Sequence, residues 1–179
     1  MAQARWPGIR SGDRIVVKGA NGSGKTTLVK IILGELEPRS GTITRADGKF
    51  IYIDQEYSLI GDQLNVYEQA QQFNSGSLEE HQIKIRLSHF LFTKDFWDKP
   101  CKSLSGGEKM RLVLCCLTLS DLPPDMIVLD EPTNNLDIQN VGILTDSINE
   151  YKGTLLVISH DEYFLGQINM RSILQLING

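Results

Sequence analysis

A glycine-rich run ending in lysine and threonine, residues 19–26, has the residue types that a phosphate site needs. Its sequence, GANGSGKT, matches G-x-x-x-x-G-K-[ST] in full, directly after the β-branched run 15–17 and before a stretch with helical apolar spacing. In such a loop the backbone N–H groups and the helix N-terminus face the phosphates, Lys25 contacts the β- and γ-phosphates, and the Thr26 hydroxyl binds Mg²⁺. A turn that merely capped a helix would not need the lysine. The predicted nucleotide contacts are Gly19, Asn21, Gly22, Ser23, Gly24, Lys25, Thr26 and Thr27.

Two adjacent carboxylates, Asp130 and Glu131, directly follow the apolar run 126–129. Ligands of open α/β sheets bind at the carboxyl ends of the strands, so this Walker B-like pattern places both side chains where a nucleotide would lie. We predict that Asp130 holds Mg²⁺, mostly through water, and that Glu131 polarises the water that attacks the γ-phosphate. Acidic residues after a strand can also simply cap the next helix. The phosphate loop elsewhere in the chain favours the catalytic interpretation over that one, and the residues do not fit a dinucleotide fingerprint.

The segment 104–108, Leu-Ser-Gly-Gly-Glu, contains a helix start, because Ser105 and Glu108 have the spacing of a capping box. A capping box gains nothing from two glycines in the first turn, each of which costs up to about 1 kcal/mol relative to alanine. Some other interaction of this segment must therefore require glycine, which leaves the backbone uncovered. Together with the phosphate loop and the carboxylate pair, this segment resembles the signature motif of the ATP-binding cassette superfamily. The resemblance covers the whole chain.

That resemblance implies roles that the spacing alone does not. It implies ATP as the nucleotide, with Ser105 and Gly107 touching the γ-phosphate held by a partner cassette. Gln55, just after the apolar run 50–53, is similar to the family's glutamine that ligates Mg²⁺ and senses the γ-phosphate, although it could also be an ordinary surface residue. The predicted Mg²⁺ ligands are thus Thr26, Gln55 and Asp130.

Two further positions follow from the same resemblance. Residues 135–137, Asn-Leu-Asp, are similar to the loop that reaches across a cassette pair, and Asp137 is also a good N-cap for the helix after it. His160, after the run 155–158, resembles the switch histidine that contacts the γ-phosphate. The alternative is a chance histidine inside a Ser159–Glu162 capping box. The predicted catalytic residues are Lys25, Glu131 and His160, and Asp137 joins Ser105 and Gly107 as contacts to the partner's nucleotide.

Within the superfamily, the chain most resembles the ABC-F proteins. The residues that carry this are Glu108, the run 130–137 (DEPTNNLD), and Ser-His-Asp at 159–161 followed by Phe164 and Leu165. ABC-F proteins are soluble tandem cassettes, with members that act on the ribosome in translation and antibiotic resistance. The resemblance implies an ATPase that works only when paired with a second cassette, in the same parent chain or a homodimer. Any ribosome or rRNA contact would come mainly from parts outside this chain.

Two alternatives share these catalytic residues. The nucleotide-binding subunit of an ABC membrane transporter would instead dock membrane-spanning partners beside a helical subdomain. A chromosome-maintenance or DNA-repair ATPase would carry a long coiled coil between the phosphate loop and the signature, but residues 33–104 show no sustained heptads. The first alternative stays open, and the second is disfavoured.

The pattern of expected elements predicts an α/β P-loop NTPase fold, with a mainly parallel sheet flanked by helices and a small inserted helical subdomain. We expect one domain, 1–179, with an α/β core at 1–57 and 101–179 and the helical subdomain at 58–100. A hairpin would join strands 42–43 and 50–53, a Ser77–Glu80 capping box would open helix 78–91, and a helix would end the chain. Further strands are expected at 15–17, 126–129 and 154–158, and further helices at 26–33, 66–73, 107–119 and 138–149.

Composition bounds the class of protein. The 179 residues are 41% hydrophobic and 22% charged, with a net charge of -4, which disfavours a surface that binds nucleic acid throughout. No apolar run approaches the roughly 20 residues of a membrane span, and Cys101, Cys115 and Cys116 show no paired spacing, so we expect a cytoplasmic chain that does not insert into membrane. The residues before Ile15 are too few for the family's first strand and adenine-stacking aromatic, and Trp6 lies too close to the loop to replace it. We therefore expect one cassette of a longer protein, trimmed on its N-terminal side.

Overall fold

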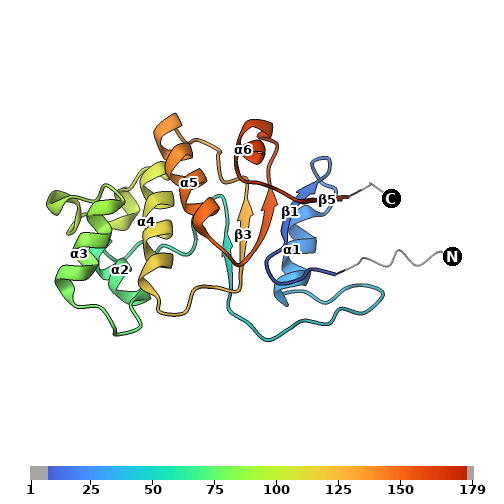
Figure 1. Cartoon of the computed structure of the whole chain (residues 1–179), viewed down its shortest axis with the longest axis horizontal. Helices are drawn as coiled ribbons and strands as arrows, with labels where there is room; N and C mark the ends of the chain where they lie inside the picture. Colours follow the sequence, from blue (N-terminus) through green and yellow to red (C-terminus); the bar gives the residue numbers. More distant parts are fainter. Residues whose placement is uncertain (1–7, 177–179) are drawn as a thin grey trace.

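The computed structural model describes residues 8–176, and its centre is a single parallel sheet (Figure 1). The strand order is β2-β3-β4-β1-β5, and every adjacent pair is parallel, with Val16 of β1 opposite Val157 of β4 and Ile127 of β3 opposite Leu155. All carboxyl ends therefore lie at one edge of the sheet. The strands are β1 (Arg14–Lys18), β2 (Phe50–Ile53), β3 (Met126–Asp130), β4 (Thr154–Ile158) and β5 (Ser172–Gln175).

Helices cover both faces of the sheet, because successive strand side chains point to opposite faces. Ile15 and Val17 of β1 pack with Val29 in the apolar cluster on the α1 side, whereas Val16 belongs to the larger cluster with α4, α5 and α6. The predicted α/β fold is confirmed by this arrangement. The helices are α1 (Lys25–Leu33), α2 (Val66–Phe73), α3 (Glu80–His89), α4 (Gly106–Leu119), α5 (Ile138–Glu150) and α6 (Glu162–Gln167), with 3-10 turns at Lys94–Phe96 and Cys101–Ser103.

The helices α2 and α3 form one end of the molecule, away from β5, and both pack on α4 (Figure 1). The contact is apolar: Ala70 of α2, Leu87 of α3 and Leu112 of α4 are fully buried. Cys115 and Cys116 are fully buried in the same layer, and burial raises the pKa of the Cys115 thiol to about 12. Because α4 also packs on α5 of the core, one continuous apolar cluster joins the helical end to the sheet. The division into a core and a 58–100 subdomain stays a proposal.

The predicted hairpin is wrong. Within the described residues, 42–43 form no strand, and β2 pairs in parallel with β3. Arg45, expected in the turn, instead donates from Nε and Nη2 to the carbonyl of Ile31, at 3.0 and 2.7 Å. The same carbonyl also accepts from the backbone N–H of Gly34 at 3.2 Å, so the guanidinium adds to the C-terminal cap of α1 and ties the 42–47 segment to that helix.

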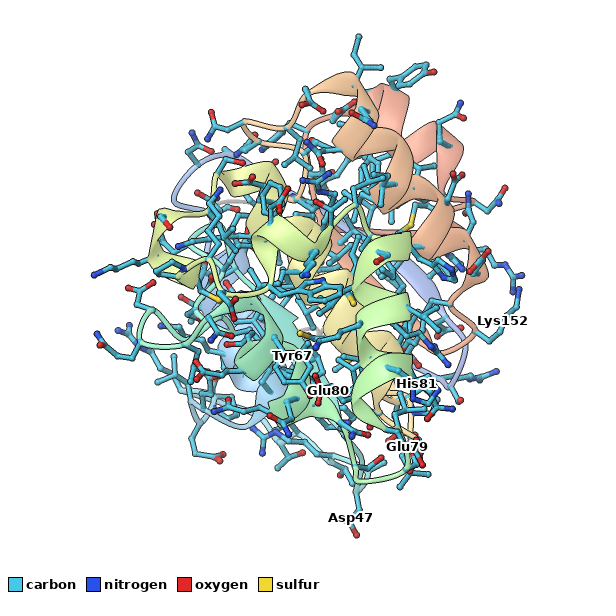
Figure 2. All side chains as sticks on the ribbon, turned by 90° about the vertical axis from the view of Figure 1, so that its left-hand side faces the viewer. Asp47, Tyr67, Glu79, Glu80, His81 and Lys152 are labelled. Carbon is cyan, nitrogen blue, oxygen red and sulfur yellow. The ribbon has the colours of Figure 1, made fainter. Side chains whose placement is uncertain are left out.

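Two helices are capped by residues other than those predicted. The helix expected over 78–91 spans only Glu80–His89, with Glu79 as N-cap and a box between Glu79 and Gln82; Figure 2 shows Glu79, Glu80 and His81 together at this helix start. The hydroxyl of Ser77 instead donates a hydrogen bond to the carboxylate of Asp121.

At α6 the N-cap is Asp161, which accepts from the N–H of Phe164 at 2.9 Å, so the Ser159–Glu162 box is also wrong. The helix expected after strand 154–158 is present as α6, but it is not the final element, because the strand β5 follows it. Sequence patterning missed β5 because only Leu174 of its four residues is buried.

Candidate functional site

The carboxyl edge of the sheet carries a pocket of about 400 Å³. Its walls come from four strand ends: the loop after β1, Gln55 after β2, Asp130 and Glu131 at β3, and Ile158 at β4. Because β4 lies between β3 and β1 in the sheet, segments more than a hundred residues apart in the chain meet here. The pocket is lined by Asn21, Gly22, Gly24, Lys25, Thr26, Thr27, Gln55, Asp130, Glu131 and Ile158, so it brings together most of the residues predicted to bind the nucleotide.

The loop after β1 contains glycines at positions where the backbone faces open space. Gly22 and Gly24 have φ of 79° and 92°, a conformation that favours glycine, and a Cβ at either would meet nothing within 4 Å. Gly24 is the N-cap of α1 and supplies no side-chain cap, which leaves the first N–H groups of the helix free for an anion. A Cβ at Gly19 would lie 2.5 Å from Ser23 Oγ, and that buried hydroxyl has no hydrogen-bond partner among the described residues.

The side chain of Lys25 folds back onto the start of the phosphate loop. Its Nζ donates to the carbonyls of Gly19 and Ala20, at 2.8 and 3.1 Å. This keeps the ammonium at the pocket wall, within a loop whose glycines leave room for phosphate oxygens. Lys25 thus lines the pocket, and its contact to phosphate stays a prediction.

The oxygen donors in the pocket fit Mg²⁺. The hydroxyl of Thr26, the amide of Gln55 and the carboxylate of Asp130 all line it, and Mg²⁺ prefers oxygen ligands. Within residues 8–176, no group of three His, Cys, Asp or Glu side chains gathers closely enough to hold a metal by itself. The donor set thus suits a cation that also takes oxygens from a bound phosphate.

Asp130 is held by a tyrosine that sequence reasoning missed. Only 8% of Asp130 is exposed, and its Oδ2 accepts a hydrogen bond of 2.8 Å from the hydroxyl of Tyr52. Tyr52 lies opposite Val128 in the β2–β3 register, so Tyr52, Val128 and Asp130 share one face of the sheet. Burial and the neighbouring carboxylate raise the pKa of Tyr52, which keeps the phenol protonated and able to donate. The two-residue offset from the parallel pairing could have revealed this pair.

Glu131 and His160 meet beside the pocket. The Glu131 carboxylate lies 3.5 Å from His160 Nε2 through Oε1, and its Oε2 accepts from the backbone N–H of His160 at 3.4 Å. Glu131 has a positive φ of 50°, while its own N–H still bonds the carbonyl of Ile158 at 2.8 Å. A left-handed conformation at a residue other than glycine costs on the order of 1–3 kcal/mol and is concentrated at functional sites. Glu131 and His160 are thus in contact, and of the two only Glu131 lines the pocket; their catalytic roles stay a prediction.

The predicted helix start at the signature segment is confirmed. Ser105 accepts from the N–H of Glu108 at 3.3 Å, and Glu108 Oε2 accepts from the N–H of Ser105 at 2.7 Å. Lys99 lies 3.2 Å from the Glu108 carboxylate. Burial alone would raise the pKa of Glu108, but the Ser105 N–H and the Lys99 ammonium outweigh it and hold that pKa below its ordinary value.

Gly107 has a reason to be glycine inside this chain. It is buried, and a Cβ there would lie 2.4 Å from Nδ2 and 2.9 Å from Cγ of Asn140. At Gly106 the nearest atom would be a Tyr57 ring carbon at 3.9 Å, so the two glycines are not equivalent. The bare backbone required at 107 is thus at least partly a matter of packing against α5.

Asn140 connects the signature to the 135–137 loop. Asp137 Oδ1 accepts from the backbone N–H of Asn140 at 2.8 Å and from its Nδ2 at 2.9 Å, which confirms Asp137 as the N-cap of α5. Ser105, Gly107 and Asp137 are therefore linked to one another. None of them is among the residues that line the pocket, within the part of the chain that the structure describes.

The chain was compared with known proteins. The family profile described as ABC transporter matches residues 8–134. ABC transporter F family member 5 of Arabidopsis thaliana is 37% identical over 172 residues, which are 92% of this chain and 24% of that protein. The curated relatives are generally much longer: this chain spans about a quarter to a third of their length.

Two solved structures resemble the chain. One is the complex of archaeal ribosomal stalk protein aP1 with the ribosome recycling factor aABCE1, with 30% identity, a TM-score of 0.72, and coverage of 92% of this chain and 32% of that one. The other is the ATP binding subunit of an ABC transporter, with 26% identity, a TM-score of 0.76, and coverage of 96% and 77%. Among the residues that the structure describes, no helix is long and apolar enough to span a bilayer. Trp6 lies outside those residues.

Proposed function

This chain belongs to the ABC transporter family of ATP-binding cassettes, and we propose on that premise that it binds Mg-ATP and hydrolyses it at an interface completed by a second cassette. One observation carries the proposal. The pocket gathers the phosphate loop, Asp130 and Glu131, whereas the signature and the 135–137 loop form a separate linked surface. A site with all parts in one chain would bring these two sets together. Two chains facing each other would complete both sites.

Each group in the pocket has a part in this chemistry. Lys25 neutralises phosphate charge by exchanging its loop carbonyls for phosphate oxygens, and the N–H groups at the start of α1 bind further oxygens. Thr26, Gln55 and Asp130 would hold Mg²⁺, which when bound would neutralise phosphate charge. Glu131 polarises the attacking water, and His160 beside it orients the Glu131 carboxylate and contacts the γ-phosphate.

Nucleotide binding is tested with a fluorescent ATP analogue and the Lys25→Ala variant. Losing a charge-assisted contact should weaken Mg²⁺-dependent binding by about 10- to 100-fold. The matched control is Lys30→Ala, also in α1 but outside the residues that line the pocket. Equal affinity of wild type and Lys25→Ala would remove the phosphate-loop assignment.

Pairing is tested by mixing two inactive variants. Lys25→Ala destroys the phosphate loop and keeps the signature, whereas Ser105→Glu places a negative charge at the signature and keeps the loop. Glutamate already serves as an N-cap in this chain at position 79, so the start of α4 should survive the change. If sites are shared between copies, the mixture should recover ATPase activity that neither variant has alone, and wild-type turnover per chain should rise with protein concentration.

The outcomes are distinguishable. Turnover by wild type that does not depend on concentration would overturn the shared-site mechanism. An inert wild type and an inert mixture, alongside an active full-length parent, would assign the partner role to another cassette of the parent and not to a second copy. Glu131→Gln should keep ATP binding and accumulate the closed pair, which sedimentation with ATP would detect.

We further propose that the parent is a cytoplasmic ABC-F protein in which this cassette drives an ATP-dependent clamp on the ribosome. The support is the Glu108, 130–137 and 159–165 resemblance, the F-family relative, and the likeness to a ribosome recycling factor. With a net charge of -4, this chain would leave most phosphate-backbone contacts to other segments. The parent with Glu131→Gln, and the equivalent change in its other cassette, should co-sediment with ribosomes more strongly with ATP than without.

A transporter subunit is the alternative, and the likeness to the ATP binding subunit of an ABC transporter, at a TM-score of 0.76, favours it. In the sedimentation experiment it would leave the parent in the membrane pellet with no nucleotide-dependent ribosome association. That outcome would remove the ABC-F proposal and leave the ATP site standing.

A further inference from the structure

Tyr52 stands at the edge of the pocket without lining it. Its ring belongs to the half-buried shell of the apolar cluster on the α1 side of the sheet, and its hydroxyl reaches Asp130 Oδ2 at 2.8 Å. Among the described residues this is the only hydrogen bond to the Asp130 side chain. A buried carboxylate with a single donor depends on that donor for its orientation.

The geometry makes the contact directional. A Tyr hydroxyl donates one hydrogen bond, and the packed ring fixes where that hydroxyl lies. The bond occupies one oxygen of Asp130 and leaves the other, Oδ1, without a donor from the described chain. The hydrogen bond therefore favours the carboxylate orientation in which Oδ2 faces Tyr52. Donors behind a metal-binding carboxylate commonly set its orientation and tune metal affinity.

We propose that Tyr52 is a positioning residue that orients the Asp130 carboxylate toward the Mg²⁺ of a bound nucleotide. The inference rests on the proposed function, since it needs a Mg-ATP site at Asp130. It adds a residue from β2 that neither the motifs nor the pocket lining identifies. Through it, the strand that delivers Gln55 also supports the ligand delivered by β3.

The experiment measures how binding of a fluorescent ATP analogue depends on free Mg²⁺, for wild type and Tyr52→Phe. Phenylalanine keeps the packed ring and removes only the hydroxyl. The apparent Mg²⁺ affinity should fall about tenfold, while binding of the analogue in EDTA stays unchanged. Tyr151→Phe is the matched control, because Tyr151 also donates a 2.8 Å hydrogen bond, to the carbonyl of Pro124 outside the pocket. It should leave the Mg²⁺ dependence as in wild type.

A double-mutant cycle separates positioning from general stability. In an Asp130→Asn background, Tyr52→Phe should cause no further loss of Mg²⁺ affinity, because its effect passes through the carboxylate. Equal Mg²⁺ dependence of wild type and Tyr52→Phe, or an equal loss in the Asp130→Asn background, would overturn the inference. A wild type whose binding never depends on Mg²⁺ would overturn the proposed metal site, and this inference with it.

Discussion

Replacing Gly107 by alanine tests whether the signature segment is shaped by its own chain. The added Cβ would lie 2.4 Å from Nδ2 of Asn140, a separation that real Cβ contacts do not show. Turning the Asn140 side chain aside would break the 2.9 Å hydrogen bond from its Nδ2 to Asp137 at the start of α5. Either that hydrogen bond breaks or α4 and α5 move apart. At Gly106 the same change meets only a ring carbon at 3.9 Å.

The effect of Gly107→Ala on the free energy of unfolding is the sum of two opposed contributions. Overpacking a tight contact costs typically about 1–3 kcal/mol, and alanine returns up to about 1 kcal/mol of helix propensity. We expect Gly107→Ala to lower the free energy of unfolding by about 1–2 kcal/mol, which for a domain of this size lowers Tm by roughly 2–8 °C. Gly106→Ala lacks the clash and should be neutral or slightly stabilising. Urea unfolding followed by circular dichroism measures both.

The Asn140→Ala variant tests whether the Asn140 side chain causes the loss of stability in Gly107→Ala. If the clash with the Asn140 side chain is responsible, Gly107→Ala should cost much less in the Asn140→Ala background than in wild type, with a coupling of about 1 kcal/mol. Two results would refute the reasoning: equal stability of the Gly106 and Gly107 variants, or additive losses in the double variant. Either would mean that the close contact does not constrain position 107.

Two further predictions concern caps near the signature. Glu108→Gln should lower stability at pH 7 by about 0.5–1 kcal/mol, because it removes the partner of Lys99. The pKa of Glu108 is depressed in the folded state, so its contribution to stability is present above the ordinary pKa near 4.5 and is lost as pH falls through the folded-state pKa. In urea unfolding at stepped pH, the stabilities of wild type and Glu108→Gln should therefore converge at low pH. A difference that stays constant with pH would contradict this role of the Glu108 carboxylate. Asp137→Ala should cost about 1 kcal/mol through the lost N-cap of α5, measured by thermal unfolding, with Asp146→Ala, on the same helix, as a control that should change little.

The features predictable from sequence are those fixed by local chemistry. Residues 19–26 could be assigned because the phosphate loop needs glycines, a lysine and a hydroxyl at set positions, and β3 because a buried strand of a parallel sheet is a continuous apolar run. The structure puts both at one pocket. The Ser105–Glu108 box and the Asp137 cap were likewise local, and both were confirmed.

The failed hairpin, the missed strand β5 and the missed Tyr52 contact all depended on contacts between distant segments, whereas the two misplaced capping boxes gave way to neighbouring N-caps, Glu79 and Asp161. Thr42 and Ile43 have β-branched side chains but form no strand, and the nearby Arg45 contacts the end of α1 instead of forming a hairpin turn. The strand β5 exists through pairing with β1, which its own sequence does not encode. Tyr52 looked like an ordinary strand residue until the β2–β3 register placed it beside Asp130.

The separation between Glu131 and His160 is set by strand pairing more than by loop sequence. Asp130 is paired with Ile158 at the end of the β3–β4 ladder, and the N–H of Glu131 extends that ladder by one more bond to the same residue. Directly after this ladder the backbone of Glu131 takes a positive φ of 50°. His160 follows Ile158 by two residues, so both side chains project from neighbouring strand ends whose register is fixed. A one-residue slip of β4 on β3 would separate them, and the buried, continuous pairing of these strands prevents it.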